Sequence, residues 1–157
     1  AFMFLMAVMV NVIYRIDPKR ENISRSRELK EITRWFVVFL AVMVQFVIVL
    51  SGIGMDINVG SMVSIPIALM FVAAGNYLPK CRQNYTMGIK LPWTLADEDN
   101  WNRTHRMAGY VWTAGGILML IMGFFHLASL FFLVFMAMVL IPSVYSYLIY
   151  RKKLKGI

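Results

Sequence analysis

The chain has 157 residues, of which 60% are hydrophobic, well above the roughly 45–50% typical of a soluble domain. This composition excludes an ordinary water-soluble enzyme, and the length leaves room for several membrane-spanning helices but for no separate soluble catalytic domain. The formal net charge is +8, with 16 lysines and arginines against 8 acidic residues. The single cysteine, Cys81, excludes an internal disulfide.

Five apolar segments without Asp, Glu, Lys or Arg follow one another along the chain: residues 1–14, 35–51, 61–78, 107–126 and 127–150. About 20 helical residues cross a hydrocarbon core of about 30 Å, so we expect the last four segments to be spans. The first is shorter and lacks an initiator Met, and we expect it to be the second half of a span. No basic segment precedes it, as a cleaved signal peptide would require. The sequence therefore predicts an all-α, polytopic membrane helix bundle with about five visible spans, the first truncated.

The basic residues fall in three clusters, within residues 15–34, 80–106 and 151–155. If the chain crosses the membrane at each apolar segment, all three clusters lie on one side, which the positive-inside rule makes cytoplasmic. The other side carries only Asp56 and His126 as ionisable residues. The high charge is thus a topology signal, which predicts a cytoplasmic C-terminus, attraction to membrane lipids and no direct nucleic-acid binding.

Two polar segments on that side have readable structure. Asp17 followed by Pro18 is typical of an N-cap and a first helical position, and predicts a cytoplasmic interfacial helix over residues 17–33. Residues 151–157 form a basic cytoplasmic tail.

The connection over residues 79–106 is much longer than the usual four to six residues. It carries apolar groups such as Trp93 and Trp101 that need burial, so we expect a structured cytoplasmic loop. Thr94 and Asp97 match a helix-capping pattern, and Asp99 with Arg103 forms an i,i+4 pair. A helix starting there is expected to run unbroken into the span at Met107.

On that helix, Trp101, His105, Ala108 and Trp112 share one face, with Glu98 adjoining. The face is either a buried, satisfied polar cluster or a site in which Glu98 and His105 act as an acid–base pair. His105 and His126 lie about 30 Å apart at opposite ends of one span, so they cannot share a metal ion. No catalytic, metal or cofactor motif is present, and we expect none.

Helix-packing signals are also present within the spans. Pro66 and Pro142 each remove one backbone hydrogen bond and predict kinks. Small residues make one face of the 107–126 span suited to close helix packing: Gly109, Thr113, Gly115, Gly116 and Gly123.

The segment Gly75–Gly109 resembles the signature region of the SdpI family, multi-pass bacterial membrane proteins associated with immunity to a secreted sporulation-delaying toxin. The matching residues are Gly75-Asn76, Pro79-Lys80, Asn84, Gly88, Pro92-Trp93-Thr94-Leu95, Trp101, Thr104-His105-Arg106 and Gly109. One departure is Lys90-Leu91, where the family often has Arg-Thr. The resemblance implies a bacterial plasma-membrane protein that protects its producer from a secreted toxin peptide. It also implies signalling, by holding a cytoplasmic repressor at the membrane.

We therefore expect an inner-face site for a ligand or partner. Its residues are Asn76, Lys80, Arg82, Asn84, Trp93, Glu98, Trp101, His105 and Arg106. The three cations would hold an anion or an acidic partner, the two asparagines would fix the loop, and the two tryptophans would set its depth.

Two other functions remain open at this stage. A small membrane enzyme would act on a lipid or peptide at the inner leaflet through Glu98 and His105. A transporter or channel subunit would use kinks at Pro66 and Pro142, although no Asp, Glu, Lys or Arg falls within a span.

Overall fold

The computed structural model describes residues 8–9, 12–13, 15–19, 21–22, 27–55, 59–125 and 127–156. Four long helices form most of this part of the chain: α3 (Arg27–Gly52), α4 (Val59–Tyr77), α6 (Glu98–Phe124) and α7 (Ala128–Leu154). Between α4 and α6 lie a short 3-10 helix, η1 (Leu78–Lys80), and a five-residue helix, α5 (Pro92–Ala96).

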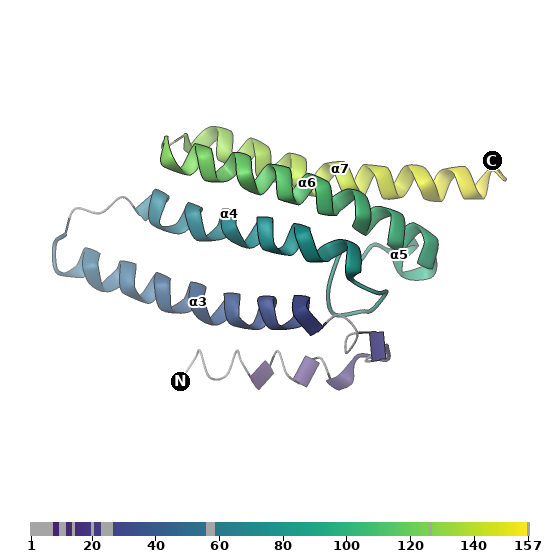
Figure 1. Ribbon diagram of the computed structural model, residues 1–157, viewed down its shortest axis with the longest axis horizontal. Helices are drawn as coiled ribbons and strands as arrows, with labels where there is room; N and C mark the ends of the chain where they lie inside the picture. The colour runs from purple at the N-terminus through teal and green to yellow at the C-terminus, as the bar shows by residue number, and fades with distance from the viewer. Residues whose placement is uncertain are drawn as a thin grey trace.

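The long helices lie side by side, with α4 between α3 and α6, and α7 packed against α6 (Figure 1). Helix α3 ends and α4 begins toward one end of the bundle, where α6 also ends and α7 begins, while residues 78–97 and the end of α7 lie at the other (Figure 1). Each long helix contains a stretch long and apolar enough to cross a membrane. The expected polytopic membrane helix bundle is thereby confirmed. Most of the first expected span, residues 1–14, lies outside the described residues, as do Asp56 and His126.

Helices α4 and α6 pack at backbone contact because small residues face each other. A Cβ added to Gly75 would lie 2.6 Å from the backbone nitrogen of Thr113, and one added to Gly116 would lie 2.9 Å from the carbonyl oxygen of Ala68. The predicted close approach at the small-residue face is confirmed. Gly115 differs from the rest of that set, because an added Cβ would meet Met138 of α7. The small residues thus serve two neighbouring helices.

The interfacial helix predicted over residues 17–33 stays a prediction, because residues 20 and 23–26 lie outside the described part of the chain. Within that part, Asp17 accepts a hydrogen bond from the backbone N–H of Lys19 at 2.8 Å, as expected of an N-cap, and Glu21 and Asn22 are helical. Helix α3 covers residues 27–33 and continues without a break into the span, since no proline or glycine lies between Arg27 and Trp35.

The helix start predicted at Thr94 is wrong. Thr94 is a helical residue of α5, and Leu91 is the N-cap.

Asp97 itself is the N-cap of α6, and its side chain accepts a hydrogen bond from the backbone N–H of Asp99 at 3.1 Å. The expected Asp99–Arg103 ion pair is confirmed at 3.0 Å. The helix runs unbroken from Glu98 to Phe124, as predicted for its passage into the span.

Candidate functional site

Residues 78–97, called the connecting loop below, fold against the ends of α6 and α7 rather than extending away from them (Figure 1). Their interior is an apolar cluster shared with α6: Leu78, Cys81, Met87, Trp101 and Ala108. Because these side chains are all buried, the connecting loop packs against α6 through its own apolar groups.

Asn84 sets the turn at the middle of the connecting loop. Its side-chain oxygen accepts hydrogen bonds from the backbone N–H groups of Thr86 at 2.9 Å and Met87 at 2.6 Å. Its amide nitrogen donates to the carbonyl oxygen of Arg82 at 2.7 Å. Since the side chain is fully buried and bonded on both sides, its hydrogen bonds are to the loop itself.

Trp101 and His105 join the connecting loop to α6, and both are fully buried. Their rings stack with centroids 4.0 Å apart. The indole N–H of Trp101 donates to the carbonyl oxygen of Cys81 at 2.8 Å. His105 Nε2 accepts from the backbone N–H of Ile89 at 3.0 Å, while Nδ1 lies 2.8 Å from the carbonyl oxygen of Trp101. One acceptor and one donor are the full capacity of a neutral imidazole, so neither ring nitrogen is available to a substrate.

The acid–base pair considered from the sequence does not form. Glu98 is exposed on the first turn of α6, whereas His105 is buried two turns further along, about 10 Å along the helix axis. His105 instead matches the other interpretation, a buried and satisfied polar group. The predicted shared face of Trp101, His105 and Ala108 is confirmed as an interior face.

A second buried network ties α5, α6 and α7 together. The indole N–H of Trp93 donates to Ser146 Oγ at 2.7 Å, and Ser146 Oγ donates to Asn100 Oδ1 at 3.0 Å. Asn100 Nδ2 returns a bond to the carbonyl oxygen of Ser146 at 3.1 Å, and Thr104 Oγ1 donates to Asn100 Oδ1 at 3.0 Å. Trp93 also stacks on Tyr150, with ring centroids 5.8 Å apart. Trp93 therefore anchors the connecting loop to α7.

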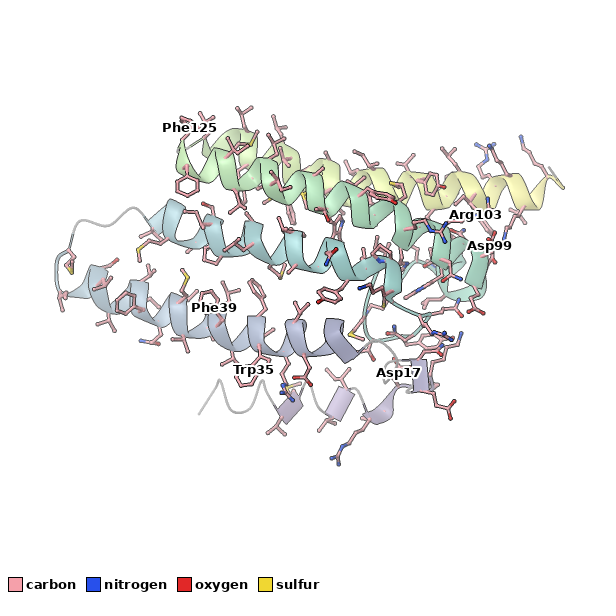
Figure 2. All side chains as sticks on the ribbon, viewed as in Figure 1. Asp17, Trp35, Phe39, Asp99, Arg103 and Phe125 are labelled. Atoms are coloured by element: carbon pink, nitrogen blue, oxygen red, sulfur yellow. The ribbon has the colours of Figure 1, made fainter. Side chains whose placement is uncertain are left out.

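The connecting loop is also bound to residues far earlier in the chain. Asp17 is only 6% exposed, and its carboxylate accepts from the backbone N–H of Tyr85 at 2.9 Å and from Thr86 Oγ1 at 2.6 Å. Asn22 Nδ2 donates to the carbonyl oxygen of Gln83 at 2.7 Å, and the ammonium of Lys19 donates to the side chain of Gln83. Figure 2 shows Asp17 beside the loop end of the bundle.

Gln83, which bonds to Lys19 and Asn22, also bonds to α5. Its side-chain nitrogen donates to the carbonyl oxygens of Thr94 at 2.8 Å and Leu95 at 2.9 Å, the third and fourth residues of α5. Sequence reasoning missed this role of Gln83, as it missed those of Asn100 and Ser146. At each of these positions the sequence shows only a polar residue beside apolar ones. That pattern does not indicate which distant residue the polar side chain will bond to.

An exposed cluster of ion pairs joins the last turn of α7 to the start of α6. Lys153 Nζ lies 2.6 Å from Asp97 Oδ2 and 2.9 Å from Asp99 Oδ2, and Arg103 pairs with Asp99. Figure 2 places Asp99 and Arg103 at the loop end, opposite Phe125.

The nine residues expected to form the site divide by burial. Asn84, Trp101 and His105 are interior and Trp93 is half-buried. The others are exposed: Asn76, Lys80, Arg82, Glu98 and Arg106. Lys80 Nζ lies over the ring of Tyr77, 4.9 Å from its centroid. Within the described ranges, no group of three or more His, Cys, Asp or Glu side chains is placed to hold a metal ion.

These features define a multi-pass helical membrane protein whose longest described connection is folded onto one end of the bundle. Residues 80–146, which comprise nearly all of that connection, α6 and most of α7, match the model of the SdpI/YfhL protein family. Immunity protein SdpI of Bacillus subtilis (strain 168) is 28% identical over 123 residues, covering 76% of this chain and 59% of that protein. The chain thus spans less than two thirds of the length of this relative.

The expected resemblance is therefore confirmed, since residues 80–146 match the model of that family. No solved structure matches the chain.

Proposed function

We propose that the protein is a bacterial plasma-membrane immunity protein that protects its cell against a secreted toxin peptide. The observation that carries this proposal is the similarity to Immunity protein SdpI over 76% of the chain. The family match includes the connecting loop, whose buried hydrogen bonds depend on the matched residues Asn84, Trp101 and His105.

In this proposal the connecting loop and the C-terminus face the cytoplasm. The support is the distribution of charge, since the cations of the loop and of the last turn of α7 lie at one end of the bundle.

A secreted toxin arrives from the opposite side, so the loop serves as an output rather than as the surface that captures toxin. The buried Asn84, Trp101 and His105 hold the shape of the loop, and Trp93 attaches it to α7. Lys80, Arg82 and Arg106 present positive charge to an anion or an acidic partner, with Asn76 and Glu98 among the exposed polar groups nearby in sequence. The finer proposal is that this surface holds a cytoplasmic repressor at the membrane once toxin is engaged.

A contact suited to such an output joins Asp17 to Tyr85 and Thr86. Any displacement of the chain before Asp17 would act directly on the middle of the loop. Coupling of this kind requires that the two contact states differ in free energy between toxin-bound and toxin-free protein.

The experiment is expression of the protein in a toxin-sensitive bacterium that lacks its own immunity protein, followed by exposure to the secreted sporulation-delaying peptide. We expect survival at least tenfold above that of the empty-vector strain. Membrane-inserted protein that gives no protection would refute the immunity function.

The signalling role has a separate readout in the same cells. We expect toxin-dependent recovery of a DNA-binding protein with the membranes, reduced in a Lys80→Gln, Arg82→Gln and Arg106→Gln triple variant. Protected cells that show no such recovery would refute the signalling role and leave immunity standing.

A further inference from the structure

At the loop end of the bundle, a cation and an aromatic ring lie near each other just after α4 and again on α6. Just after α4, Lys80 lies over Tyr77. On α6, Arg106 and Tyr110 are four residues apart on one face, and Tyr110 is 74% exposed. Aromatic and basic side chains gather where a membrane helix leaves the hydrocarbon.

The pairs after α4 and on α6 lie at a common depth. Lys80 and Arg106 are close in level because Pro79 packs on Gly109, where an added Cβ would lie 2.5 Å from Pro79 Cγ. From Val59 to Tyr77 and from Arg106 to Phe124 the helices each cover 19 residues, or about 28 Å. That length matches a hydrocarbon core of about 30 Å. These two pairs therefore mark one hydrocarbon boundary.

The cations of α7 lie further out. Asn100 bonds to Ser146 and Trp112 bonds to Met138, so Arg106 is level with about residue 142 of α7. Arg151 follows about nine residues later, or about 13 Å beyond that level. The last turn of α7 accordingly extends past the hydrocarbon boundary at which Lys80 and Arg106 lie.

Lys80 and Arg106 have no counter-charge within the described part of the chain. Carboxylates lie within 4.0 Å of Arg34, Arg103 and Lys153, but of neither Lys80 nor Arg106. Both side chains are exposed. Below Arg106, an exposed apolar stripe runs along α6 through Tyr110, Ile117, Ile121 and Phe124. Cations at a hydrocarbon boundary above an apolar stripe present the two surfaces that an anionic phospholipid requires.

We propose that Lys80 and Arg106 bind the headgroup phosphate of an anionic phospholipid, whose acyl chain lies along the Tyr110–Phe124 stripe of α6. In the absence of toxin, the depth of the two cations favours a lipid, whereas the repressor proposed above would engage the same cations only once toxin is bound. Each cation near an anionic surface adds enough attraction to raise affinity about fivefold. The site is independent of the immunity function, because it rests on charge, depth and exposure alone.

The test uses the purified full chain in neutral detergent, with bound lipid counted by native mass spectrometry. We expect phosphatidylglycerol to be retained in preference to phosphatidylcholine. Lys80→Gln and Arg106→Gln should each lower phosphatidylglycerol affinity about fivefold, and the double variant about 25-fold. Lys80→Arg with Arg106→Lys should retain most of the affinity.

Arg103→Gln is the matched control, because Arg103 is an exposed cation on the same helix that already pairs with Asp99. We expect it to bind phosphatidylglycerol within twofold of the unchanged protein. The proposal is overturned if the double variant binds as the unchanged protein does, if Arg103→Gln loses as much affinity, or if phosphatidylcholine binds equally well. Displacement of the lipid by an acidic soluble peptide, or by glycerol phosphate at equal concentration, would also overturn it. Helix content of every variant is checked by circular dichroism, and since no toxin is present, the result is separate from the test of immunity.

Discussion

The indole N–H of Trp112 donates to the carbonyl oxygen of Met138 across the α6–α7 interface, at 3.0 Å. Four residues after Met138 comes Pro142, which has no N–H and so leaves this carbonyl without its partner inside α7. A carbonyl with no partner in hydrocarbon costs several kcal/mol, and the neighbouring helix supplies the missing donor. The proline of one helix and the tryptophan of the other therefore form a single structural unit.

We expect Trp112→Phe to destabilise the bundle by about 1–3 kcal/mol, because it removes the donor and keeps an aromatic ring. In a Pro142→Ala background the same change should cost less, since residue 142 then supplies its own N–H to Met138. Thermal unfolding of the four proteins in one detergent measures the coupling. Equal costs of Trp112→Phe in both backgrounds would contradict this account.

Gly88 and Gly54 provide a matched pair for backbone strain and close packing. Both have positive φ, +98° and +81°. An added Cβ at Gly88 would meet the ring of His105 and lie 3.2 Å from Trp101, whereas Gly54 has nothing within 4 Å. We expect Gly54→Ala to cost about 1–2 kcal/mol from backbone conformation alone. Gly88→Ala should cost more and expose the connecting loop to protease, and equal effects of the two changes would show that the packing is unimportant.

The connection of the loop to α7 offers a contrast between buried and exposed polar contacts. Ser146→Ala leaves the buried donor of Trp93 without an acceptor, which we expect to cost about 1–3 kcal/mol and to change tryptophan fluorescence. Lys153→Gln removes only exposed ion pairs, which water and salt screen, so we expect no measurable change in unfolding temperature. A larger loss from Lys153→Gln than from Ser146→Ala would reverse our ranking of the two contacts.

Asp17→Asn tests the link between Asp17 and the connecting loop. An amide replaces one acceptor oxygen by a donor, which then faces either the N–H of Lys19 or those of Tyr85 and Thr86. We expect a loss of about 1–3 kcal/mol and faster hydrogen exchange at Tyr85 and Thr86. Glu98→Gln, at an exposed residue, is the control and should leave exchange at both positions unchanged. If exchange at Tyr85 does not rise in Asp17→Asn, the proposed coupling through Asp17 is wrong.

The long apolar segments and the spacing of charges on one helix were the features that could be predicted from the sequence. Four apolar segments of sufficient length became long helices, and the Asp99–Arg103 pair lies on the unbroken α6 as expected. The helix start predicted at Thr94 was wrong, because the Thr94 hydroxyl bonds to Ile89 and Leu91 from inside α5. Asp17 bonds both to the N–H of Lys19, as the sequence suggested, and to the distant Thr86, which the sequence did not reveal.

The amino-acid sequence by itself determined the number and length of the apolar helices described here, because hydrocarbon excludes charge whatever the neighbours are. It also determined that the cations gather at one end of the bundle. Only the tertiary structure decided which polar residues of the signature segment are interior. Asn84, Trp101 and His105 are buried and fully bonded, while Lys80 and Arg106 remain exposed, because each buried polar group needs a partner that folding brings from elsewhere in the chain.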